Sequence, residues 1–221
     1  MYPTSNQMPS FGTAPPPPEH FDAAQPAPPP PYHQTQPMSR EDQYRNIIHK
    51  YEISQEYSDI LQKLRDFKIV FIFDDSGSMS STLSESPLNE INKNSMLKAT
   101  RWDELQYFAN ISVEIASFFN NESNSGTDVY FLNKPPIKNI VSVDAFMHHL
   151  RQLKPNGYTP LNKIFNLALN ENMSAIKERK LVIIILTDGE PSDDYGRTDI
   201  KGFKNSLLAR NPMNKIFFNI M

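Results

Sequence analysis

Residues 68–78 read Lys-Ile-Val-Phe-Ile-Phe-Asp-Asp-Ser-Gly-Ser. The apolar run ends abruptly at Asp74, where a polar cluster begins. A strand that is buried on both faces has such an unbroken run, because neither of its faces meets water. In open parallel sheets, ligands bind at the carboxyl ends of strands, which is where this cluster would lie. Residues 68–78 therefore predict an α/β sheet with a site at the end of its first strand.

The rest of the chain alternates between helical and extended patterns. From Arg101 to Asn120, apolar residues recur at helical spacing, and Thr100 is placed to cap that helix. The run Leu181–Leu186 predicts a second strand that is buried on both faces. The other predicted elements are strand 128–132, a weaker edge strand 137–143, helix 144–153, a helix that begins at Thr159-Pro160, a helix from a Thr198 cap to Arg210, and strand 215–221. This alternation predicts a doubly wound α/β fold, a mostly parallel central sheet with helices on both faces.

The first 38 residues differ in composition from the rest. The chain contains 19 prolines, and 12 of them fall within residues 1–40. With almost no branched aliphatic side chains, residues 1–38 cannot offset their chain entropy by burial, so we expect a disordered proline-rich tail. Its run Pro29-Pro30-Pro31-Tyr32 resembles the Pro-Pro-x-Tyr ligand of WW domains, which implies a WW-domain protein as a partner. A solvated polyproline II spacer is the alternative.

Residues 39–67 are charged and amphipathic. Their apolar side chains recur at three- and four-residue steps, and Ser54 lies in a gap where it can cap a second helix. We expect two short helices, or one kinked helix, that pack onto a domain formed by residues 68–221. This segment carries no visible chemistry.

The composition of the whole chain excludes several classes of protein. The 22 basic and 25 acidic side chains give a net charge of −3, which favours neither nucleic acid nor a membrane surface as a partner. The absence of cysteine excludes disulfides, thiolate catalysis and cysteine-ligated zinc. The longest aliphatic run is far shorter than the ~20 residues of a membrane span. No positive charge precedes Arg40, so we expect no secretory signal and an intracellular, cytoplasmic protein.

Three polar loops are predicted to meet at one edge of the sheet. Two of them follow the most apolar strands, and the third, residues 156–159, precedes a helix. Their candidate side chains carry only oxygen ligands and include no histidine: Asp74, Ser76, Ser78, Thr159 and Asp188. Such a set favours Mg²⁺, with Mn²⁺ as the alternative. The ion would remain able to bind one more anionic oxygen, so we expect a docking site for an exposed Asp or Glu of a protein partner. Gly77 is expected to permit the tight turn that aims the serines.

At this point the chain resembles a family, over residues 68–221. Residues 73–79 resemble the Asp-x-Ser-x-Ser motif of von Willebrand factor type A domains, residues 157–161 that family's threonine loop, and residues 186–189 its aspartate loop. The resemblance implies a metal-ion-dependent adhesion site. It also implies that the hydroxyls contact the metal, that the two aspartates act directly or through bound water, and that a partner's Asp or Glu completes the coordination.

Two stretches depart from the family's pattern. Residues 80–100 form a longer polar insert than the family usually has before its first helix. The family's sheet also continues, beyond a strand like the one predicted at 215–221, with another strand and a closing helix. We therefore expect a C-terminally truncated domain with an exposed sheet edge.

Simpler interpretations of the same polar residues remain open. A single aspartate at a strand end can just cap or solvate a turn, and Thr159 already has a structural role as a helix cap. A group of neighbouring carboxylates is predicted to form a solvated acidic rim around the site: Asp75, Glu190, Asp193 and Asp194.

Two other functions compete with the binding module. A Mg²⁺-dependent phosphohydrolase of the haloacid-dehalogenase type would use Asp74, Thr187 and Asp188, but Ser76 stands where that chemistry needs a general acid. We therefore expect no enzymatic activity. The other alternative is a scaffold that acts mainly through its proline-rich tail.

Overall fold

The computed structural model of the chain describes residue 12 and residues 38–91, 97–121 and 125–221. The chain divides into two units, residues 1–37 and residues 38–221, and the second holds every helix and strand of the described residues. The predicted proline-rich tail, with its Pro29-Pro30-Pro31-Tyr32 run, lies outside the described residues apart from Gly12 and Met38.

The second unit is built on a mixed five-stranded sheet with the order β3-β2-β1-β4-β5. Strand β1 pairs in parallel with both β2 and β4, and β5 pairs in parallel with β4, whereas β3 is antiparallel to β2. The strands are β1 (Phe67–Phe73), β2 (Thr127–Phe131), β3 (Ile137–Ile140), β4 (Lys180–Leu186) and β5 (Ile216–Ile220). The predicted α/β class and mostly parallel sheet are confirmed.

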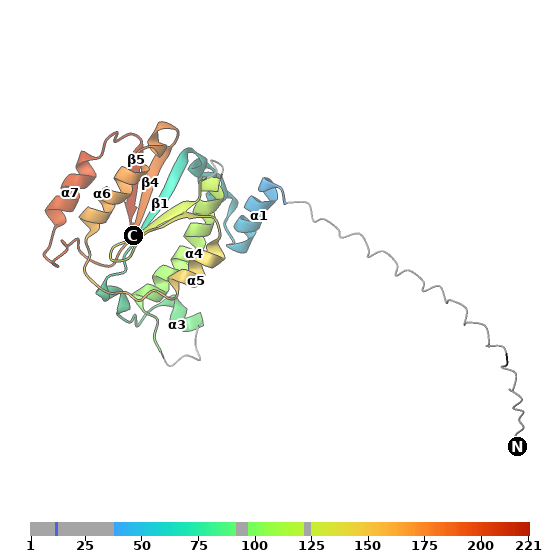
Figure 1. Cartoon of the computed structure of the whole chain (residues 1–221), viewed down its shortest axis with the longest axis horizontal. Helices are drawn as coiled ribbons and strands as arrows, with labels where there is room; N and C mark the ends of the chain where they lie inside the picture. The colour runs from blue at the N-terminus through green and yellow to red at the C-terminus, as the bar shows by residue number, and fades with distance from the viewer. Residues whose placement is uncertain (1–11, 13–37, 92–96, 122–124) are drawn as a thin grey trace, which may run out of the picture. The chain divides into compact units, whose positions relative to one another are not determined.

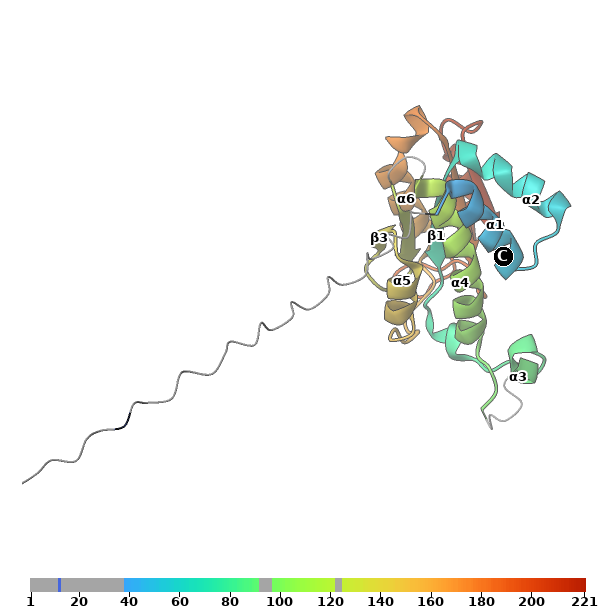
Figure 2. The ribbon, with the colours of Figure 1, turned by 90° about the vertical axis from the view of Figure 1, so that its right-hand side faces the viewer.

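Helices cover both faces of the sheet (Figures 1 and 2). The α-helices are α1 (Arg40–Lys50), α2 (Gln55–Leu61), α3 (Pro87–Ile91), α4 (Arg101–Asn120), α5 (Val143–Leu150), α6 (Leu161–Asn172) and α7 (Ile200–Ala209). Short 3₁₀ turns occur at η1 (Gln62–Asp66), η2 (Gly77–Ser80) and η4 (Ala175–Lys177). In Figure 1, α6 and α7 lie on one side of the strands, and α4 and α5 on the other.

The alternating side chains of β1 supply two separate hydrophobic cores. Phe71 and Phe73 pack with α4 and α5 on one face, whereas Val70 and Ile72 pack with α6 on the other. All four side chains are essentially inaccessible to solvent. This two-sided burial explains why the strand is an unbroken apolar run rather than an alternating one.

The strand order places a switch point between β1 and β4. From β1 the chain moves outward through β2 to β3, and it then crosses to β4 and β5 on the other side. In open α/β sheets, the crevice outside the carboxyl ends of the strands at such a point is the usual position of a ligand site. Asp74 and Thr187 directly follow these two strands.

The N-terminal helices pack against α4. The guanidinium of Arg40 donates a hydrogen bond to the Phe118 carbonyl (2.6 Å), and the Tyr44 ring stacks on Phe118 at 5.3 Å between centroids. Ser54 accepts a hydrogen bond from the Tyr57 amide and so begins α2, as the sequence predicted. The structure therefore has two short α-helices between residues 39 and 67, not one kinked helix.

Several predicted boundaries were wrong by a few residues. The edge strand β3 ends at Ile140 rather than Val143, because Ser142 caps α5 and draws the following residues into the helix. Asp199, not Thr198, caps α7, since its carboxylate accepts a hydrogen bond from the Gly202 amide. Pro160, not Thr159, occupies the position before α6.

Among the described residues, no helix combines the length and apolar character that crossing a membrane would require.

The side chain of Asn120 joins the end of α4 to β1. Its amide accepts a hydrogen bond from the Ile69 N–H (3.0 Å) and donates one to the Ile69 carbonyl (2.9 Å), in a fully buried position. Asn120→Ala leaves both backbone groups without these partners, so we expect a loss of about 2–4 kcal/mol in the free energy of unfolding. Urea denaturation measures it. The exposed Asn170 of α6 is the matched control, and its change to alanine should alter stability by less than about 0.5 kcal/mol. Equal effects of the two changes would contradict the role of Asn120.

Candidate functional site

The pairing of β1 with β4 continues beyond the strands and brings two polar segments together. The Asp74 N–H donates a hydrogen bond to the Leu186 carbonyl (2.9 Å), which extends the ladder by one step. The carboxylate of Asp74 then accepts two hydrogen bonds, from the Ser76 amide (2.8 Å) and the Thr187 hydroxyl (2.5 Å). Asp74 is fully buried. Loss of solvation on burial raises the pKa of this carboxyl above its ordinary value of 3.8, and the hydrogen bonds from Ser76 and Thr187 oppose that shift.

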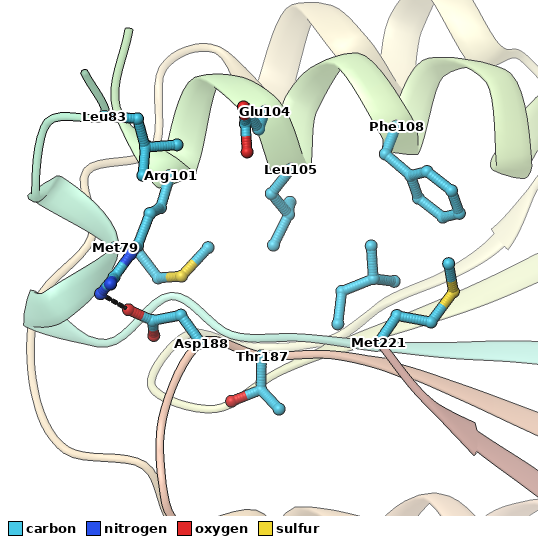
Figure 3. Close-up of a pocket in the computed structure, with 10 residues that line it drawn as sticks. Met79, Leu83, Arg101, Glu104, Leu105, Phe108, Thr187, Asp188 and Met221 are labelled. Atoms are coloured by element: carbon cyan, nitrogen blue, oxygen red, sulfur yellow. Dashed lines mark hydrogen bonds and ion pairs between the residues drawn. The ribbon is translucent and has the colours of Figure 1, made fainter. Parts of the chain in front are cut away.

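Ser76, Ser78 and Asp188 form a short chain of oxygen atoms. The two serine hydroxyls lie 3.0 Å apart, and the Ser78 hydroxyl donates to Oδ1 of Asp188 at 2.8 Å. Oδ2 of the same carboxylate forms an ion pair with the guanidinium of Arg101, drawn as the dashed line in Figure 3. The structure thus brings three of the predicted site residues into direct contact, across 110 positions of the sequence.

Thr159 lies beside the loop that contains Asp188. A Cβ atom added to Gly189 would lie 3.6 Å from the Thr159 hydroxyl. The backbone of Thr159 is held by Ser192, which donates its N–H to the Thr159 carbonyl (2.9 Å) and accepts the Thr159 N–H at its own hydroxyl (3.0 Å). Within the described residues, the Thr159 hydroxyl makes no hydrogen bond, and it caps no helix. The predicted competing role of Thr159 as a helix cap was therefore wrong, and its hydroxyl is available.

The glycine that shapes the site is Gly157, not Gly77. Gly157 has a φ of +92°, in the left-handed region that favours glycine, and a Cβ there would lie 2.3 Å from Oδ1 of Asn133. Gly77 has no positive φ, and an added Cβ would make only ordinary contact with the Gly157 carbonyl at 3.7 Å. That carbonyl accepts a hydrogen bond from the Gly77 N–H (3.0 Å). This bond joins residues 156–159, the Thr159 loop, to residues 76–78, the serine turn.

Asp75 is not part of a solvated rim. Its side chain is fully buried, and Oδ1 accepts hydrogen bonds from the backbone N–H (2.7 Å) and side-chain amide (3.3 Å) of Asn133. Burial raises the pKa of this carboxyl as well. The prediction was wrong because the loop after β2, which covers Asp75, is far away in the sequence. The exposure of Glu190 and Asp194 agrees with the predicted rim, whereas Asp193 is half-buried and bonded within its own turn.

Arg101 was missed by the sequence reasoning. Thr82 and Thr100 form an antiparallel bridge, so the insert leaves the serine turn and returns beside it, and α4 begins next to the site. Arg101, the first residue of α4, thereby reaches Asp188. Together they lie at one end of a cavity of about 340 Å³ between α4 and the ends of β4 and β5. Its other lining side chains are largely apolar, among them Met79, Leu105 and Met221 (Figure 3).

The donor set fits a small hard cation. Its described side chains offer only oxygen: two carboxylates, two serine hydroxyls and the free hydroxyl of Thr159. Neighbouring ligands of an octahedral Mg²⁺ with bonds of 2.0–2.1 Å lie about 2.9 Å apart. The oxygen separations along Ser76, Ser78 and Asp188 are 3.0 and 2.8 Å; these contacts are hydrogen bonds, and their lengths are compatible with that ligand spacing. The described residues contain no group of three or more histidines, cysteines or carboxylates that could hold a metal, so any site here depends on hydroxyl ligands.

Comparison with known proteins adds no relative. None of the protein-family models that were scanned matches the chain, and a search of the curated proteins also gives no match.

The burial of Asp74 predicts a pH-dependent cost to the metal-free fold. A carboxyl whose folded pKa is raised binds its proton more tightly in the native state, so stability falls as pH rises from 3.8 to the folded pKa. Asp74→Asn keeps an oxygen for the Ser76 amide and removes the charge. We therefore expect the variant to be more stable than the wild type at pH 7 in EDTA, and the difference to shrink toward pH 4. Urea unfolding at several pH values measures it. The exposed Glu178→Gln is the control, and a less stable Asp74→Asn at pH 7 would contradict the argument.

Proposed function

We propose that the domain is a metal-dependent protein-binding module, with Mg²⁺ held at the carboxyl ends of β1 and β4. The observation that carries the proposal is the chain of oxygens from Ser76 through Ser78 to Asp188, whose separations are compatible with neighbouring ligands of Mg²⁺. Its position at the switch point of the sheet supports the proposal, since ligands of open α/β folds bind there.

The residues have distinct roles in this proposal. Ser76, Ser78 and Thr159 supply neutral hydroxyl ligands, whereas Asp74 and Asp188 supply the negative charge, directly or through water. The bound ion would supply a Lewis-acidic position for one further anionic oxygen, because the two carboxylates only balance its formal charge and the Arg101 guanidinium adds a positive charge beside Asp188. Mn²⁺ is the alternative ion.

The expected ligand is an exposed Asp or Glu of a partner protein. A carboxylate is the anionic oxygen ligand that a protein surface can offer, and the half-exposed guanidinium of Arg101 adds positive charge beside the site. The resemblance of residues 73–79, 157–161 and 186–189 to von Willebrand factor type A domains supports the same assignment, since partner carboxylates complete the metal site in that family.

A thermal-shift titration of the full chain with Mg²⁺ tests the metal site. A ligand that binds only the folded state at about 100 times its Kd stabilises that state by about 2.7 kcal/mol, which corresponds to a Tm rise of about 5–10 °C. We expect this rise in the wild type and in Glu178→Gln, an exposed carboxylate before β4 at the opposite end of the sheet, and its loss in Ser78→Ala and Asp188→Asn. An equal rise in all four proteins would show that Mg²⁺ binds elsewhere.

Partner chemistry is tested with two immobilised peptide libraries. In one, each peptide carries a single Asp or Glu among neutral residues, and in the other Asn or Gln replaces it. We expect Mg²⁺-dependent retention of the full chain on the acidic library alone, abolished by EDTA and by Ser78→Ala. Retention that survives both changes would argue against the module.

Two further measurements separate the competing functions. Turnover of para-nitrophenyl phosphate that Asp74→Asn abolishes would favour the phosphohydrolase. Partner capture that disappears on deletion of residues 1–38, with Mg²⁺ binding intact, would favour the scaffold that acts through its tail.

A further inference from the structure

Asp75 connects three loops at the edge of the sheet. Its Oδ1 accepts both hydrogen bonds from Asn133, in the loop after β2. Its backbone carbonyl accepts the N–H of Asn156 (2.7 Å), in the loop that leads to Thr159. Asp75 itself lies between Asp74 and Ser76, within the proposed metal site. One buried residue thus joins the turn of residues 76–78 to the loop after β2 and to the loop that leads to Thr159.

The two outer loops are also joined to each other. The side-chain amide of Asn133 donates to the Tyr158 carbonyl at 2.8 Å, one residue before Thr159. The ammonium of Lys134 lies 3.7 Å from Oδ2 of Asp75 and also donates to the side-chain carbonyl of Asn156. These bonds hold residues 156–158 from one side, while the Gly77 N–H holds the Gly157 carbonyl from the other.

We propose that Asp75 is a positioning residue that holds the Thr159 loop against the serine turn, so that the Thr159 hydroxyl faces the proposed metal site. The effect on metal affinity rests on the proposed function, whereas the effect on the loop does not. Asp75 is not itself a ligand, because its buried Oδ1 is occupied by Asn133 and its Oδ2 faces Lys134.

The three hydrogen bonds that Asp75 accepts do not require its negative charge. The three hydrogen bonds use Oδ1 and the backbone carbonyl, and Oδ2 has no hydrogen-bond partner. Asparagine preserves an oxygen at the Oδ1 position, whereas alanine removes it. Asp75→Asn should therefore retain the loop position that Asp75→Ala loses.

Hydrogen exchange of the full chain in EDTA tests the positioning without any metal. Loss of Oδ1 in Asp75→Ala would release Asn133, which holds the Tyr158 carbonyl. We therefore expect residues 156–158 to shift and the Gly77 and Asn156 amides to exchange at least about tenfold faster than in the wild type, although alanine keeps the backbone carbonyl that accepts the Asn156 N–H. Exchange in Asp75→Asn should stay within about threefold of the wild type, and the Val113 amide in α4 is the unchanged reference. Unchanged Gly77 exchange in Asp75→Ala would overturn the proposal. If that variant does not fold, Asn133→Ala, which removes the exposed amide that holds Tyr158, should accelerate the same amides.

A double-mutant cycle with Thr159 tests whether Asp75 acts through that residue. Calorimetric titration with Mg²⁺ should show Asp75→Ala and Thr159→Val each weakening binding by about tenfold, and the double variant binding no more weakly than Thr159→Val alone. Asp75→Asn should restore wild-type affinity within about threefold. Independent effects, which multiply to about a hundredfold, would overturn the proposal. If even the wild type binds no Mg²⁺, the proposed function fails, and the exchange experiment still decides the role of Asp75.

Discussion

The parallel pairing of β1 with β4 is the constraint on which the other features depend. The two strands are buried between helices on both faces, so a shift of their register by one residue would exchange the two hydrophobic cores. The ladder runs on to the Asp74 N–H, and this last bond sets the Asp74 carboxylate within reach of the Thr187 hydroxyl. The packing of the whole sheet thereby keeps the polar groups of the site at hydrogen-bonding distance from one another, although the site itself contains little apolar surface.

That arrangement has an energetic cost, which is concentrated in two adjacent carboxylates. Asp74 and Asp75 are both fully buried, and burial raises the pKa of each. Hydrogen bonds from backbone and side-chain donors offset part of the cost, and Lys134 lies near the second carboxylate. Buried carboxylates stabilise a fold less than neutral side chains of similar size would, which makes Asp74 and Asp75 candidates for a functional role.

Arg101 shows how the fold balances charge at the same place. The insert of residues 80–100 turns back on itself through the bridge between Thr82 and Thr100. The first residue of α4, Arg101, therefore lies next to Asp188. The guanidinium neutralises this carboxylate, and Ser78 occupies the other oxygen. The same cation remains half-exposed, next to the largely apolar cavity beneath α4. A carboxylate approaching the site would meet both Arg101 and the proposed metal ion.

The sequence by itself determined the order and kind of the strands and of the helices other than α3, and the oxygen chemistry of the candidate site. The apolar runs of β1 and β4, the periodicity of α4 and the polar residues after each strand are local signals, and they depend on near neighbours alone. Only the tertiary structure decided that Asp75 is buried, that Arg101 pairs with Asp188 and that Thr159 caps no helix. The physical reason is distance along the chain: the contacts of Asp75 with Asn133 span 58 positions, and that of Arg101 with Asp188 spans 87. Contacts of this range exist only once the sheet has assembled, and no local pattern of residues encodes them.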